Sequence, residues 1–192
     1  MLDRITEALT RRRLGGAVLL LAGIAVAAIV LWPDDGDDDE PVRAKVAPVR
    51  LVSVPPLGLA FGHPTSWKRT VRGRVIELRS PDRSVVMIFS SPVAGEEPRA
   101  AKAAAEKALR KQFAPAKIVR DGPGKLGPRT VATFELTGRD KTGPVRVLVL
   151  VGTTPQRTYV VTLLTGGDPT VARIREARQI LNTVRFSKPV KG

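Results

Sequence analysis

The chain has 192 residues, a formal net charge of +14, one histidine and no cysteine. Without cysteine, a disulfide framework and a lipid-modified N-terminal cysteine are both excluded, and a single histidine also excludes an ordinary structural zinc site. The length suffices for one domain with its own hydrophobic core in addition to the N-terminal segments.

Residues 14–32 form an apolar run without charge or proline. A helix of this length rises roughly 28 Å, close to the hydrocarbon thickness of a bilayer. Residues 1–13 carry a net charge of +2 and include Arg11, Arg12 and Arg13, whereas residues 33–40 carry −6. Because arginine excess marks the cytoplasmic side, we expect a single-pass transmembrane anchor with residues 1–13 as a cytoplasmic stub and the remainder outside the cytoplasm.

Two alternatives to an anchor are a cleaved signal peptide and a buried helix of a soluble protein. Ala25-Val26-Ala27 resembles a signal-peptidase site, so cleavage after Ala27 stays open. The apolar run continues beyond that site to Trp32, which favours an anchor. A buried helix of a soluble protein would show a polar face, and this run shows none.

Residues 33–56 are expected to be a linker, acidic at first and then rich in proline. Like charges at residues 34–40 repel one another and keep the chain extended. An EF-hand calcium loop would need a glutamate at its twelfth position, and counting from Asp34 that position is Lys45. The acidic block is therefore interpreted as a solvated spacer.

The folded domain is expected over residues 57–187, followed by a short tail at 188–192. Alternating or continuous apolar patterns predict strands at residues 57–61, 74–80, 84–90, 116–120, 129–138, 145–151 and 158–165. A loop is expected at residues 121–128. Helices are predicted over 98–113, with an apolar stripe that includes Ala105 and Leu109, and from Pro169 onward, with Asp168 as N-cap.

Short turns between successive strands predict a mainly antiparallel sheet. Its central strands are apolar on both faces, so both faces need cover. The fold class expected is α+β, with a sheet of six or seven strands flanked by two helices as an α/β/α sandwich, preceded by one transmembrane helix.

The segment from Phe61 to Trp67, with Pro64 between them, resembles the F-x-x-P-x-x-W motif that opens PsbP-like domains. The resemblance continues through the order of elements to residues 180–186 and covers about residues 57–187. LpqN-type lipoproteins and a Ran-binding nuclear transport factor share that fold. The resemblance implies a fold but no activity, because the family has no single function.

Two motifs were considered as catalytic or cofactor sites. Residues 122–127 fit G-x-G-x-x-G, but Pro123 and Pro128 remove backbone donors and a strand follows, which is typical of a loop and not of a dinucleotide site. His63 lies beside Pro64 and lacks a recognisable nucleophile partner. We therefore expect no enzyme, no catalytic residues, no cofactor and no metal site.

The charge of residues 41–192 is +18, once the +2 and −6 of the N-terminal segments are removed from the total. Such a field attracts anions. Arg173, Arg175 and Arg178 on the last helix are a candidate anion patch, although a solvated helix face is the simpler interpretation. Trp67 is a candidate ligand platform, although a core position is favoured.

The partner is expected to be an unknown protein or an anionic envelope component, with the membrane contacted by the single span. Binding of single-stranded nucleic acid would need exposed aromatic side chains among the basic ones. Most aromatic residues of the domain fall in apolar patterns, so no nucleic acid is expected. The leading hypothesis is a non-enzymatic binding or accessory domain outside the cytoplasm, and the alternative is electrostatic binding of anionic polymer or lipid head groups.

Overall fold

A computed structural model describes residues 49–91, 97–141, 143–166 and 169–187. No helix within these ranges is long and apolar enough to span a bilayer. The predicted stub, the anchor at 14–32, most of the predicted linker and the tail at 188–192 lie outside the described residues. The fold below is that of the domain that follows them.

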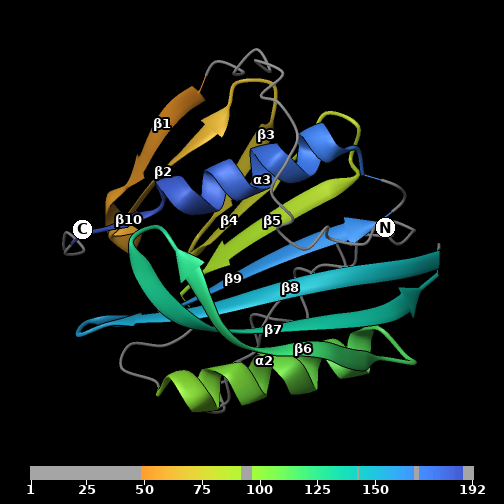
Figure 1. Cartoon of the computed structure of the whole chain (residues 1–192). Coiled ribbons are helices and arrows are strands. Elements are labelled where there is room, and N and C mark those ends of the chain that lie inside the picture. The colour runs from red at the N-terminus through yellow and green to blue at the C-terminus, as the bar shows by residue number, and fades with distance from the viewer. Residues whose placement is uncertain (1–48, 92–96, 142, 167–168, 188–192) are drawn as a thin grey trace, which may run out of the picture.

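The domain is built on a seven-stranded sheet and a three-stranded sheet (Figure 1), and every strand pair is antiparallel. The large sheet has the order β3-β4-β5-β9-β8-β7-β6 and the small sheet the order β1-β2-β10. The large sheet consists of β3 (Lys68–Arg72), β4 (Val75–Arg79), β5 (Val85–Ser90), β6 (Lys117–Leu126), β7 (Arg129–Asp140), β8 (Gly143–Thr154) and β9 (Arg157–Gly166). The small sheet consists of β1 (Val49–Val54), β2 (Leu59–Pro64) and β10 (Arg185–Phe186), with a 3-10 turn, η1 (Pro55–Leu57), between β1 and β2.

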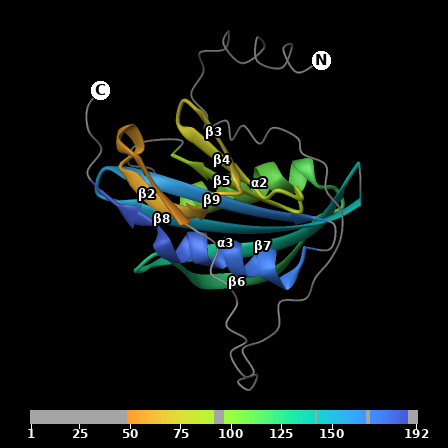
Figure 2. The ribbon, with the colours of Figure 1, turned by 90° about the horizontal axis from the view of Figure 1, so that it is seen from above.

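Two helices, α2 (Pro98–Gln112) and α3 (Val171–Thr183), lie on opposite faces of the large sheet (Figure 2). Under α2 lies one core cluster, which contains Ala101, Ala105, Leu109 and Phe113 of the predicted stripe, whereas Ala108, also predicted to belong to it, is half-buried. A second cluster is shared by α3, the small sheet and the other sheet face. The α+β class, the antiparallel sheet and the two flanking helices are thus confirmed.

The central strands are buried on both faces, as the apolar runs predict. Five of the six residues of β5 are buried, and β9 is buried along most of its length. Helix α3 contributes Ala177, Ile180 and Leu181 to its cluster. Removing these apolar surfaces from water is the main stabilising term of the domain.

The predicted linker boundary at residue 56 was wrong. Residues 49–54 form β1, which pairs with β2 from Val49 opposite Pro64 to Val54 opposite Leu59. The prolines at 48 and 55 flank this strand and do not interrupt its ladder. The linker was predicted from the prolines in this region, and β1 is nevertheless a strand, of which only Val52 is buried.

Three further element boundaries differ from expectation. Strand β6 continues through most of the predicted loop at 121–128, and Pro123 is tolerated because β6 is an edge strand. Strand β3 was not predicted, since its sequence Lys-Arg-Thr-Val-Arg lacks apolar alternation. The N-cap of α3 is Thr170, whose side chain accepts a hydrogen bond from the Arg173 N–H, in place of the predicted Asp168.

Candidate functional site

The hairpin formed by β3 and β4 carries the densest group of unpaired cations in the described parts of the chain. We call Lys68, Arg69, Arg72 and Arg74 the basic hairpin. All four side chains are exposed, and none forms a hydrogen bond or ion pair with a described residue. Gly73, with φ of 56°, supplies the left-handed turn between Arg72 and Arg74. The hairpin therefore projects positive charge along an edge of the sheet.

The only carboxylate on this hairpin is already engaged. Residues 68–79 contain one acid, Glu77, which accepts a hydrogen bond from Arg79 Nη2 at 2.6 Å. The pair lies on β4, the inner strand of the hairpin. Neither partner neutralises the four cations on β3 and in the turn.

Elsewhere the few acids of the domain are placed against particular bases. These ion pairs are Lys102–Asp121, Arg110–Glu106, Arg146–Glu135, Arg173–Asp82 and Arg173–Glu176. Other described surfaces therefore combine paired and unpaired cations, whereas all four cations of the basic hairpin lack an ion-pair partner among the described residues.

A hydrogen-bonded cluster fixes the base of the hairpin to α3. Trp67, the residue before β3, donates from Nε1 to Glu176 Oε2 at 2.8 Å. Arg173 donates from Nη1 to the same oxygen at 2.7 Å and from Nε to Asp82 Oδ2 at 3.1 Å. Asp82 lies in the turn that follows β4, so the cluster holds both ends of the hairpin. We call these four residues the clamp.

Asp82 is the most strongly perturbed acid of the clamp. Burial by itself would raise its pKa, but hydrogen bonds from Ser80, Ser84 and Arg173 outweigh that effect and lower the pKa to about 2. Arg173 has a raised pKa, chiefly because it donates to Glu176 and also to Asp82. Both groups therefore stay charged over the ordinary pH range and hold each other in place.

The structure assigns Trp67 to the core. Its side chain belongs to the α3-side cluster and the residue is 3% exposed. The core position favoured by the sequence is confirmed, and the ligand-platform alternative is wrong because the ring presents no open face. The indole N–H, the one polar group of the side chain, is satisfied by Glu176.

The three arginines of the candidate anion patch do not act together. Arg173 is half-buried in the clamp, with a carboxylate on each side, while Arg175 and Arg178 are exposed. Residues two apart on a helix do not face each other, so Arg173 and Arg175 diverge. Arg173 therefore positions the basic hairpin and is not available to bind an external anion.

Two other sequence motifs are structural. His63 lies within β2, is 4% exposed, and contacts the Pro64 carbonyl through Nδ1 at 2.8 Å. Residues 122–126 belong to the edge strand β6, so this glycine-rich motif does not open a helix. In the described ranges no group of three or more His, Asp or Glu side chains could hold a metal ion.

The basic hairpin itself was missed by the sequence analysis, which treated the positive charge as a property of the whole domain. A local signal was present. Residues 68–74 contain four cations and no acid, which is a high local density of positive charge.

Comparisons with known proteins place the fold. No protein-family model matches the chain, and no curated protein matches it in sequence. Cyanobacterial PsbP (CyanoP) from Synechocystis sp. PCC 6803 superposes with a TM-score of 0.52 at 14% identity, covering 78% of this chain and 98% of that one. A crystal structure from Bacteroides thetaiotaomicron gives a TM-score of 0.52 at 12% identity over 72% of this chain and 48% of that one, so the match spans about half the length of that protein.

LpqN of Mycobacterium tuberculosis, described as involved in cell envelope biogenesis, is 16% identical with a TM-score of 0.49, covering 76% of this chain and 94% of that one. At the identity of the CyanoP match the likeness establishes the fold alone, and the domain has a PsbP-like fold.

Proposed function

We propose that this protein is a non-enzymatic accessory domain, tethered outside the cytoplasmic membrane by residues 14–32, which binds anionic lipid head groups through the basic hairpin. The observation that carries the proposal is the set of four exposed cations on residues 68–74 without a carboxylate partner among the described residues. The PsbP-like fold is compatible with a binding role but does not specify one.

The four cations lie along one strand and its turn. Lys68 and Arg72 are on the same face of β3 and Arg69 is on the other, so an anionic surface would meet all of them only at the edge of the sheet. Strand residues rise about 3.3 Å each, so β3 is roughly 13 Å from first to last Cα, and neighbouring cations lie within the screening length of about 8 Å at physiological salt. A basic side chain near an anionic membrane contributes about 1 kcal/mol. Four together would support reversible, salt-sensitive association.

The position of the hairpin favours a membrane as the anionic surface. Val49, where the described chain begins, pairs with Pro64 at the end of β2, and Lys68 opens β3 only four residues later. The chain therefore comes from the predicted anchor to a point beside the base of the basic hairpin. A tether of residues 33–48 would raise the effective concentration of the hairpin at the bilayer surface.

Charged residues on an edge strand also prevent sheet-to-sheet pairing, and β3 is such a strand. Prevention of such pairing would explain the charges of Lys68, Arg69 and Arg72, which lie within the β3–β4 ladder. It does not require Arg74, which lies in the turn beyond the last ladder pair, Arg72 with Val75.

Vesicle sedimentation tests the proposal. Both core clusters lie within residues 49–187, so a fragment of residues 41–192 should fold by itself. We expect it to bind vesicles that contain phosphatidylglycerol and not vesicles of pure phosphatidylcholine. Arg72→Glu with Arg74→Glu should abolish this binding, whereas equal binding to both vesicle types would refute a charge-based role. Binding to a soluble anionic polymer but not to anionic vesicles would assign the hairpin to an envelope polymer instead.

The tether has its own test. Protease added to intact spheroplasts should digest the chain beyond Trp32 and spare residues 1–13. The expectation follows from the charges of +2 and −6 on the two flanks of the apolar run. Protection of the domain until the membrane is lysed would reverse the proposed orientation.

A further inference from the structure

The large sheet divides at one end, between β7 and β8. Their ladder runs from the pair Asp140 and Gly143 to the pair Ala132 and Val151. Beyond it, residues 129–131 of β7 remain paired only with β6, and residues 152–154 of β8 only with β9. The two strand ends diverge, with the β6–β7 hairpin curving toward α3 and β10 (Figure 1). We call this opening the fork.

The fork is held open by contacts at the tip of the β6–β7 hairpin. Gly127 donates its backbone N–H to the Leu181 carbonyl at the end of α3, at 2.8 Å. Its φ is +57°, and a Cβ there would lie 2.0 Å from the Val184 carbonyl oxygen. This close approach requires glycine. The hairpin tip is thus bound to the end of α3, and β7 bends away from β8.

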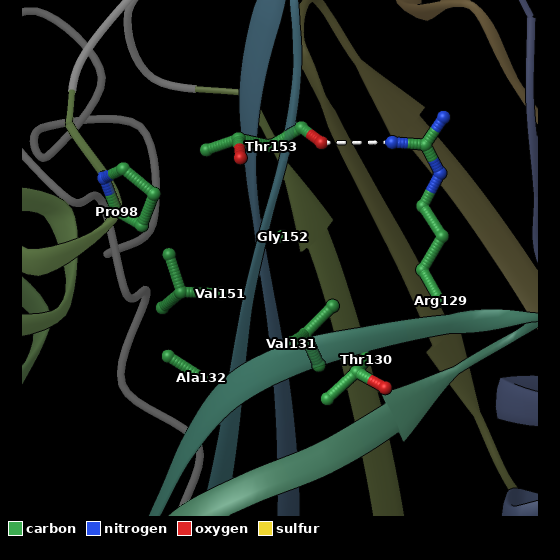
Figure 3. A pocket seen from close by; sticks show the side chains of 8 residues that line it. All are labelled: Pro98, Arg129, Thr130, Val131, Ala132, Val151, Gly152 and Thr153. Carbon is green, nitrogen blue, oxygen red and sulfur yellow. Dashed lines mark hydrogen bonds between the residues drawn. The ribbon is translucent and has the colours of Figure 1, made fainter.

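A cavity of about 310 Å³ lies in the fork (Figure 3). It is lined by Pro98, Arg129, Thr130, Val131, Ala132, Val151, Gly152 and Thr153. In Figure 3, Arg129 lies across the fork from Pro98, and its Nη1 donates to the Thr153 carbonyl at 3.0 Å. The lining combines valine and alanine side chains with two threonine hydroxyls and one cation, and it contains no acid.

Arg129 is positioned but not neutralised. Its guanidinium lies 5.3 Å from the centre of the Phe186 ring, and its side chain makes no ion pair with a described residue. Apart from the bond to Thr153, its donors have no partner among the described residues. The guanidinium can therefore accept a planar, two-oxygen ligand.

A second cation stands one strand away. Arg157 is the first residue of β9 and lies opposite Thr154 in the β8–β9 ladder. Thr154 follows Thr153, whose carbonyl accepts the hydrogen bond from Arg129. Its Nη1 is buried and has no hydrogen-bond partner in the described chain. A buried guanidinium donor without a partner is costly and calls for a ligand, an ion or water. Arg157 does not line the cavity, so Arg129 is the one cation of its lining, and Arg157 adds only to the positive potential around the fork.

We propose that the fork binds the carboxylate of a small amphipathic molecule, with Arg129 holding the carboxylate and Val131, Ala132 and Val151 receiving the apolar part. Two sources share this chemistry: a free alkanoic acid and the C-terminal residue of a peptide. The open backbone edges of residues 129–131 and 152–154 give a peptide additional hydrogen-bonding partners. The site is separate from the basic hairpin, which lies on the opposite edge of the sheet.

The proposal is tested by titrating hexanoate into the fragment of residues 41–192. Binding is measured by calorimetry and by changes in the amide NMR shifts. Saturable binding is expected, with shifts centred on Val131, Gly152 and Thr153, and the neutral analogue hexanamide should bind at least about tenfold more weakly. The same titration is done with the dipeptide acetyl-Ala-Val, once with a free C-terminal carboxyl and once as the C-terminal amide. Tighter binding of the peptide acid than of hexanoate identifies a peptide C-terminus, and the reverse order identifies a free acid.

Matched variants locate the site. Arg129→Ala should weaken hexanoate binding at least about tenfold, while Arg139→Ala, which removes the same charge from the exposed far end of β7, should not. Ala132→Leu keeps both arginines and fills the cavity, so it should also weaken binding. Arg72→Glu with Arg74→Glu should leave it unchanged. The proposal is overturned by equal binding in the Arg129 and Arg139 variants, by shifts outside the fork, or by the absence of saturable binding.

Discussion

The arginines at the base of the β3–β4 hairpin and those on the hairpin itself differ in whether they have carboxylate partners. In the clamp, Arg173 lies between Asp82 and Glu176 and fixes the hairpin to α3. On the hairpin, Arg72 and Arg74 have no such partners and face solvent. The difference shows that the surroundings of an arginine in this domain depend on where the few acids lie, and not on the overall charge.

The largest expected effect concerns Trp67, which joins the clamp to the core. Trp67→Ala removes a buried indole and should cost about 3–5 kcal/mol of unfolding free energy. A domain of this size has only about 5–15 kcal/mol in total. Chemical denaturation of the fragment 41–192 measures the change, and an unfolding midpoint equal to that of the wild type would contradict a core role.

Trp67→Phe separates packing from hydrogen bonding at the same position. It keeps an aromatic ring in the core but deletes the Nε1 donor to Glu176. We expect a loss of about 1–3 kcal/mol, the cost of leaving a partly buried acceptor without this donor. A loss as large as that of Trp67→Ala would mean that the clamp contact, and not ring packing, dominates.

Arg173→Met should cost about 1–2 kcal/mol, because it leaves Asp82 and Glu176 without their shared cation. Arg175→Met is the matched control on the same helix, and being exposed it should change stability by less than about 0.5 kcal/mol. Thermal unfolding of the two variants compares them. Equal effects would remove the distinction between the clamp and the exposed arginines.

Acid should loosen the clamp through Asp82. Its pKa is about 2 in the folded domain, below the ordinary value of 3.8, so its contribution is fully present above pH 3.8. That contribution is lost as the pH falls from about 4 toward 2. Asp82→Asn should therefore be less stable than the wild type at neutral pH, and the difference should shrink over this window. A constant difference down to pH 2 would exclude Asp82 as the titrating group.

Much of the fold follows from local sequence patterns. The central strands β5, β8 and β9 have apolar residues on both faces, and α2 has its alanine stripe, so their type and order could be predicted. Edge elements could not. Strand β3 is charged and β6 contains Pro123 between two glycines, so both lack the apolar periodicity that marks a strand. Strand β1 is mostly apolar, but the prolines on its flanks indicated a linker.

The sites were less accessible to prediction than the fold, because they depend on contacts between distant residues. Trp67 and Glu176 are 109 residues apart in sequence, and Arg173 and Asp82 are 91 apart. The spacing of three arginines predicts a patch on α3, but it does not show that Arg173 lies between the carboxylates of Asp82 and Glu176. The fork depends on the bend of β7 over the end of α3, which no local pattern encodes.

The salt dependence of vesicle binding tests the central claim most directly. Two variants change charge equally: Arg72→Glu with Arg74→Glu on the basic hairpin, and Arg175→Glu with Arg178→Glu on α3. Wild type and the α3 variant should bind anionic vesicles with similar affinity and lose it steeply as salt rises, because counterions compete with the hairpin. The hairpin variant should show almost no binding at low salt. Equal weakening in the two variants would show that net charge alone drives association and would contradict a defined site on the basic hairpin.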